Sequence, residues 1–246
     1  RLQVTDYPVE TGNGSVTMKL LVTNPSSRLS WGISQFLGSS HDVALASGPF
    51  EHGCSTNDLT RNVDVVVHSL ENEVSPDETV MLDRAMRQTY NLLSACVEER
   101  VRRFIFLGSL EIMKGYDEDY LVNEKWRPLP TSEITTLCVH MAEFVCREFG
   151  REGRIDVCSL RLGDLQWEEP IDSTSMLRGD DALQAIQRAV EQNIVDGHIP
   201  IPKSTLLPGR TWSIFHIQSV PDFKEPRFNT ARAQEMLGFV PEGSIL

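Results

Sequence analysis

The segment from residue 23 to residue 30 joins two apolar stretches and is rich in side-chain hydrogen-bonding groups. The stretch before it, residues 18–23, is typical of a strand, and the stretch after it, residues 29–37, is typical of a helix. A strand, a tight turn and a helix N-terminus can bind a phosphate, because the first N–H groups of the helix are unpaired. The side chains that could contact such a ligand are Thr23, Asn24, Ser26, Ser27, Arg28 and Ser30.

This segment lacks the glycines of a dinucleotide-binding loop. The pattern Thr-Gly-x-x-Gly-x-x-Gly would place them where the chain has Asn24, Ser27 and Ser30. Asparagine tolerates a positive φ, but the Cβ atoms of the two serines would push a pyrophosphate or the helix outward. The hydroxyls and Arg28 leave weak anion binding open, although an arginine at such a position is more often a solvated loop residue. We therefore expect NAD(P) binding to be weak or lost.

Strands and helices alternate along the chain from residue 18 to about residue 165. The expected strands cover residues 18–23, 42–46, 63–68, 101–107 and 155–162, and the expected helices cover residues 27–37, 78–97 and 132–150. Thr131 or Ser132 is the expected cap of the last helix. This alternation predicts an α/β fold with a Rossmann-like, doubly wound parallel sheet.

The order of elements becomes less regular after Gly163. We expect a helix over residues 180–194, a Pro- and Gly-rich connection over 197–209, a strand over 212–217 and a helix over 229–237. The predicted organisation has three parts: an N-terminal extension (1–17), a Rossmann-like NAD(P)-binding-fold domain (18–165), and a small C-terminal substrate-type lobe interleaved with it (166–246).

Composition excludes several classes of protein. The formal net charge of −12 argues against binding nucleic acid or an anionic membrane. Arg100, Arg102 and Arg103 form a short basic cluster, which we expect to be a solvated turn. No apolar run is long enough to span a membrane, and no signal-peptide pattern is present. The five cysteines have no metal-ligand spacing, so we expect no metal site, mainly buried reduced thiols and a cytoplasmic location.

Several segments together resemble the extended short-chain dehydrogenase/reductase family, the NAD-dependent epimerases and dehydratases. The matching segments, in family order, are VDVVVH (63–68), NLLSA (91–95), VRRFIFLGS (101–109), EFVCREFG (143–150), DVCSLRLG (156–163) and RFN…LGFVP (227–241). The resemblance covers roughly residues 18–241 and implies a Rossmann domain with strand order 3-2-1-4-5-6 and a smaller substrate lobe.

The resemblance also implies positions for catalytic residues. Ser109 occupies the place of the catalytic serine or threonine. The Tyr-x-x-x-Lys pair would fall either on Ile134 and Cys138 or on Thr135 and Val139. Neither alignment supplies a phenol or an ammonium group, so ordinary proton transfer is not expected.

Other family positions are altered or ambiguous. The acid that binds the adenosine ribose would fall on Ala46 or Ser47. His68 ends a strand where the family often has histidine, and it could contact the cofactor or simply pack in the core. A displaced Tyr/Lys pair could also come from the polar loop that holds Lys114, Tyr116, Tyr120 and Lys125.

These features predict a divergent, catalytically inactive family member that acts as a binding, regulatory or structural subunit. The alternative is an active NAD(P)-dependent nucleotide-sugar epimerase or dehydratase with non-standard catalytic residues. The expected helices 78–97 and 132–150 match those that pair family members, so a homodimer or a complex with a related subunit is expected through them.

Overall fold

The computed structural model describes residues 17–71, 77–168, 173–194, 212–220 and 226–242. The expected N-terminal extension therefore lies outside the described residues except for Thr17, and the connection at 197–209 lies wholly outside them. The domain boundary near residue 165 stays a sequence-based prediction.

A six-stranded sheet forms the centre of the molecule, and every pair of neighbouring strands is parallel. Its order is β2-β1-β3-β4-β5-β8. The strands are β1 (Lys19–Thr23), β2 (Asp42–Ala46), β3 (Val65–His68), β4 (Arg103–Ser109), β5 (Asp156–Leu162) and β8 (Trp212–Ile217). The predicted parallel α/β sheet is confirmed.

The edge of this sheet differs from the order 3-2-1-4-5-6 that the family resemblance implied. That order places two strands beyond the first, whereas β2 alone lies on that side of β1 in the described part of the chain. The interval between β2 and β3 instead forms a short helix, α2 (Cys54–Thr60). This interval contains Gly48, Pro49 and Gly53 among polar residues, so it has no apolar run that could add a further buried strand.

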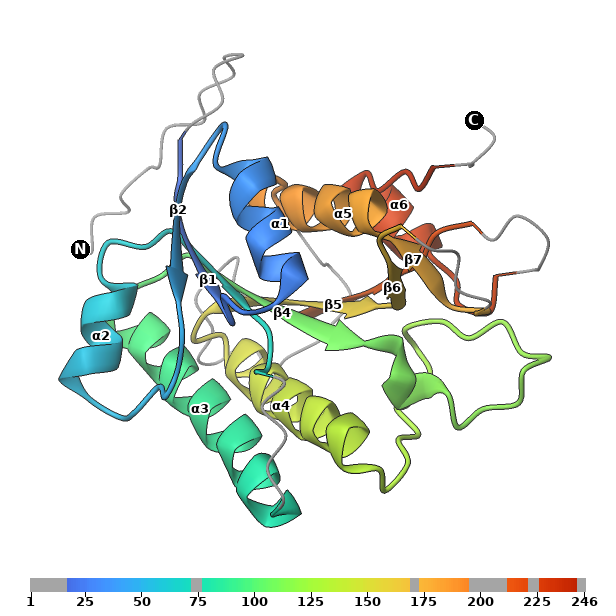
Figure 1. Ribbon diagram of the computed structural model, residues 1–246, viewed down its shortest axis with the longest axis horizontal. Coiled ribbons are helices and arrows are strands. Elements are labelled where there is room, and N and C mark those ends of the chain that lie inside the picture. The colour runs from blue at the N-terminus through green and yellow to red at the C-terminus, as the bar shows by residue number, and fades with distance from the viewer. Residues whose placement is uncertain (1–16, 72–76, 169–172, 195–211, 221–225, 243–246) are drawn as a thin grey trace, which may run out of the picture.

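Helices cover both faces of the sheet (Figure 1). One face carries α1 (Arg28–Leu37), α5 (Gly179–Glu191) and α6 (Ala231–Leu237), and the other carries α3 (Glu78–Glu98) and α4 (Ile134–Arg151), with α2 packed beside α3. Each face has its own apolar core. Consecutive valines of β3 are fully buried because successive side chains of one strand point to opposite covered faces.

Three short elements follow the C-terminal ends of β4 and β5. The 3-10 helix η1 (Leu110–Met113) continues directly from β4. After β5, β6 (Asp164–Gln166) pairs in parallel with β7 (Met176–Arg178) in a separate two-stranded sheet. These elements place the segment around Trp167 against α1 and α5.

The cap of α4 is Glu133, not Thr131 or Ser132 as expected. Its carboxylate accepts hydrogen bonds from the backbone N–H groups of Thr135 and Thr136 at 3.1 and 2.8 Å. The hydroxyl of Thr135, which also donates to this carboxylate, and then the two backbone N–H groups lower the pKa of Glu133 to about 2. A longer acidic side chain can therefore cap this helix from a position that a serine or threonine pattern does not indicate.

The expected solvated arginine turn is wrong for Arg103, whereas Arg100 and Arg102 are exposed. Arg103 is buried; it donates to Asp156 at 2.6 Å and to the carbonyls of Ala189 and Gln192 at the end of α5. Arg102 donates to a third carbonyl of the same helix end at 3.0 Å. The unpaired carbonyls and the negative end of the α5 dipole attract these cations, which the local sequence could not indicate.

The cysteine predictions agree with the structure where it tests them. Four cysteines are buried, Cys54 is exposed, and all five are free thiols. In the described ranges no helix is both long and apolar enough to cross a membrane.

Candidate functional site

The β1–α1 loop is held by its own side chains. Asn24 adopts a positive φ of 57°, as its glycine-replacing position predicted. Its amide nitrogen donates to the carbonyl of Leu70 at 2.8 Å, and its amide oxygen accepts from Ser26 at 3.0 Å. Asn24 therefore ties the loop after β1 to the segment after β3.

The serines at the other two glycine positions also bond to the chain itself. Ser30 is fully buried, and its hydroxyl donates to the carbonyl of Thr23 at 2.8 Å. Ser27 caps α1 by accepting the N–H of Leu29 at 3.2 Å. Both hydroxyls are thus engaged in the turn.

Arg28, the cationic residue of this loop, has a carboxylate partner. Its guanidinium donates to Glu168 at 2.7 Å and lies 4.9 Å above the ring of Trp167. The same ring packs so closely on Gly179 that a Cβ there would lie 2.3 Å from it. The aromatic ring and the ion pair thus connect α1, α5 and the segment after β6.

His68 is a buried, neutral histidine. Its Nδ1 lies 2.9 Å from the hydroxyl of Thr23, and its Nε2 lies 3.2 Å from the hydroxyl of Thr89. Burial lowers the pKa of His68 to about 3. Because both ring nitrogens have hydroxyl partners and aromatic rings surround the imidazole, the packing interpretation accounts for every contact described for it.

Ser109 lies at the end of β4, where the family resemblance placed it. Its hydroxyl accepts the backbone N–H of Glu111 at 3.1 Å and so caps η1. This contact is local, and Ser109 is not among the described residues that line the cavity at the start of α4.

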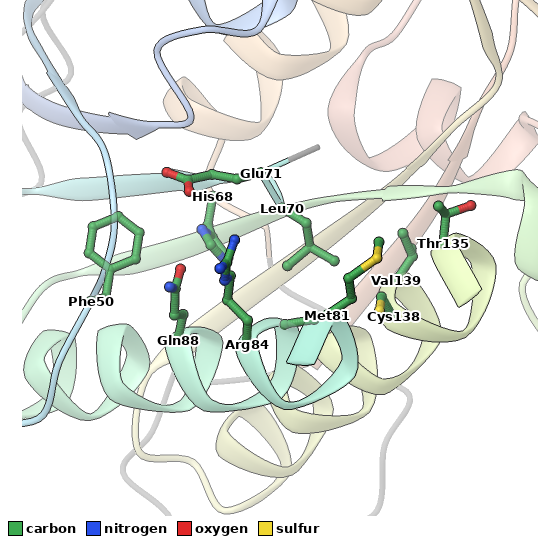
Figure 2. Close-up of a pocket in the computed structure, with 11 residues that line it drawn as sticks. Phe50, His68, Leu70, Glu71, Met81, Arg84, Gln88, Thr135, Cys138 and Val139 are labelled. Atoms are coloured by element: carbon green, nitrogen blue, oxygen red, sulfur yellow. The ribbon is translucent and has the colours of Figure 1, made fainter. Parts of the chain in front are cut away.

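A cavity of about 150 Å³ lies where the end of β3 meets α3 and the first turns of α4, and we call it the α3–α4 cavity. Its lining residues are Phe50, His68, Leu70, Glu71, Met81, Arg84, Ala85, Gln88, Thr135, Cys138 and Val139. Figure 2 shows the α3 side chains below the end of β3 and the α4 side chains beside them.

The cavity is lined by both residues of one of the two alignments proposed for the Tyr/Lys pair. Thr135 and Val139, four residues apart on α4, both line it, whereas Ile134 does not. Cys138 lines it between them. No tyrosine or lysine is present among these lining residues.

In the loop that could have supplied a displaced Tyr/Lys pair, Lys114 and Tyr116 bond to other groups. The ammonium of Lys114 pairs with Glu111 and, at 3.2 Å, with Asp164. These carboxylates raise the pKa of Lys114 against the opposing effect of burial, which is the largest single influence. The hydroxyl of Tyr116 donates to the carbonyl of Arg127 at 2.8 Å.

The α3 residues of the cavity were not predicted from the sequence. Met81, Arg84, Ala85 and Gln88 recur at helical spacing and so share one face of α3. That periodicity was a detectable signal, but apolar residues such as Met81 and Ala85 at helical spacing are equally typical of ordinary core packing. In the described ranges no group of three metal-ligating side chains is close enough to hold an ion.

Comparisons with known proteins give the family and the fold. The model of the NAD dependent epimerase/dehydratase family matches residues 41–167, just over half of the chain. The match begins after α1, so β1 and the loop at 23–30 lie outside it. No curated protein sequence matches the chain.

Solved structures of this fold are similar over nearly the whole chain. Glucuronic acid dehydrogenase from Chromohalobacter salexigens has a TM-score of 0.73 at 18% identity, with 93% of this chain and 86% of that one covered. UDP-N-acetylglucosamine 4-epimerase from Bacillus cereus has a TM-score of 0.72 at 17% identity, covering 93% and 95%. MoeE5 in complex with UDP-glucose and NAD has a TM-score of 0.69 at 16% identity, covering 92% and 94%.

Proposed function

Because the chain belongs to the NAD-dependent epimerase/dehydratase family, we propose that it is a member without the family's ordinary hydride chemistry. It acts instead as a binding, regulatory or structural subunit. The observation that carries this proposal is the wall of the α3–α4 cavity. There Thr135 and Val139 occupy the positions that the tyrosine and the lysine would take in one of the two alignments.

The loss of a proton-transfer pair is costly for catalysis. A positioned acid/base group contributes about 10²–10⁴-fold in rate. A threonine hydroxyl is a poor substitute at neutral pH, and that of Thr135 already donates to Glu133 at 2.6 Å. Ser109, Lys114 and Tyr116 bond to other groups, so none of these contacts supports a replacement pair.

The β1–α1 loop fits a dinucleotide poorly. Pyrophosphate binding needs close backbone approach, free N–H groups and nearby positive charge. Here the Ser30 side chain fills a glycine position, Ser27 takes up an N–H of the first helical turn, and Arg28 pairs with Glu168. These contacts support weak or absent NAD(P) binding.

A turnover assay tests the proposal. The purified protein is incubated with NAD⁺ or NADP⁺ and with uronates or UDP-N-acetylglucosamine, alongside an active family member as the positive control. We expect neither reduced cofactor nor epimerised product. Steady turnover that Ser109→Ala abolishes would favour the alternative, an active NAD(P)-dependent epimerase or dehydratase with non-standard residues.

We further propose association through α3 and α4, as a homodimer or as a complex with a related subunit. The two helices pack on each other and leave Val80, Tyr90 and Phe144 between 41% and 48% exposed. Light scattering of the purified chain is expected to give a dimer that Phe144→Glu dissociates. A monomer that also fails to recruit a related subunit would contradict this proposal.

A further inference from the structure

We propose that the α3–α4 cavity is a binding site for one small, uncharged ring compound of aromatic size. The inference rests on the proposed loss of the Tyr/Lys pair, because short side chains at Thr135 and Val139 leave this volume open. It adds a class of ligand that the family chemistry does not assign to the site.

The size of the cavity limits the ligand to a single ring or a small bicycle. A volume of about 150 Å³ equals that of an engineered apolar cavity that binds benzene. Pockets for drug-sized ligands are larger, about 300–1,000 Å³. A whole dinucleotide therefore cannot occupy this space.

The walls favour an apolar ligand. Phe50, Ala85 and Cys138 are buried and contribute apolar surface to the cavity. Leu70 and Met81 add further apolar surface (Figure 2). Moving an apolar ring from water onto this surface is favourable in proportion to the area that it buries.

The polar groups of the cavity provide no net charge for an ionic ligand. His68 is neutral, and both of its nitrogens have hydroxyl partners. Glu71 and Arg84 have opposite formal charges, and one Glu71 oxygen accepts the N–H of Gly48 at 2.8 Å. Burying a carboxylate or ammonium is unfavourable unless a charged partner is dedicated to it, and the opposite charges of Glu71 and Arg84 offset each other, so we expect a neutral ligand. Gln88 can bond a neutral polar substituent on the ring.

Fluorine NMR titration tests the site with three probes of similar shape: fluorobenzene, para-fluorobenzoate and para-fluorobenzylammonium. We expect saturable binding of fluorobenzene and at least about tenfold weaker binding of both charged probes, because their charges would be desolvated. A fluorobenzene signal that never saturates, or equal affinity for all three probes, would overturn the inference.

Cavity-filling variants locate the binding. Thr135→Phe and Val139→Phe should each weaken fluorobenzene binding at least tenfold, whereas Val240→Phe, an exposed position outside the cavity, should leave it unchanged. Melting curves without probe establish that each variant is folded. Unchanged affinity in both folded cavity variants would contradict the assignment.

Thiol protection gives a readout on the unmodified protein. Fluorobenzene should slow the alkylation of Cys138 by N-ethylmaleimide without affecting exposed Cys54. An unchanged Cys138 alkylation rate at saturating probe would count against the site.

If no probe binds and no NAD-dependent turnover occurs, the cavity inference fails while the proposed function stands. If turnover occurs, the proposed function fails whatever the probes do.

Discussion

Acidification should destabilise the fold through His68, and the size of the effect follows from its burial. The pKa of His68 is about 3 in the folded protein, against 6.5 for an unperturbed histidine. The unfolded chain therefore binds a proton that the folded chain does not. The free energy of unfolding therefore keeps its full value above about pH 6.5. It decreases progressively as the pH falls toward 3, because only the unfolded chain is protonated in that range.

The magnitude can be worked out from the two pKa values. Between about pH 8 and about pH 5, a group with this shift removes about 2 kcal/mol from the free energy of unfolding. His216 is also buried, and burial together with Arg161 lowers its pKa to about 3, so it adds a similar amount. We expect the wild type to lose about 4 kcal/mol over this range from the two histidines.

Urea denaturation followed by tryptophan fluorescence measures this loss. His68→Asn should lower stability at both pH values, because it removes hydrogen bonds to Thr23 and Thr89. Its loss between the two pH values should be about 2 kcal/mol smaller than that of the wild type. A pH-dependent loss equal to that of the wild type would refute the buried neutral state of His68.

Three further substitutions test other parts of the structure, each by urea or thermal denaturation. Glu143→Gln should cost about 3–5 kcal/mol, because it removes the charge that pairs with buried Arg161 at 2.6 Å; a cost below 1 kcal/mol would contradict a buried pair. Arg28→Ala should cost less than about 1 kcal/mol, because its ion pair is exposed, and it should not change any thermal shift by NADH; a lost shift would indicate phosphate binding. Gly179→Ala should cost about 1–3 kcal/mol, because the new Cβ overlaps the Trp167 ring; wild-type stability would mean that the ring can move away.

The sequence predicted the regular elements well because hydrophobic periodicity reports burial directly. The expected strand at 42–46 and the expected start of the α3 helix at residue 78 coincide with the structure. Helix α2 was not predicted, because its seven residues are mostly polar and have no apolar stripe. The short β6 and β7 strands were also missed, since three residues give no readable period.

Long-range partners limited the prediction of the site. The hydroxyls of the β1–α1 loop were identified, but the sequence could not reveal that Ser30 bonds to Thr23. Glu168 is 140 residues from Arg28, so their pairing depends on the path that the chain takes after β6. The α3–α4 cavity depends on the meeting of four segments that are distant in sequence, which no local pattern encodes.

Calorimetric titration of the protein with NAD⁺ tests most directly whether this Rossmann fold has lost the ability to bind the coenzyme. The account predicts no saturable heat up to about 1 mM, which corresponds to binding no tighter than about −4 kcal/mol. A dissociation constant near 1 μM, about −8 kcal/mol, that is weakened by substitution in the loop at residues 24–30 would contradict it.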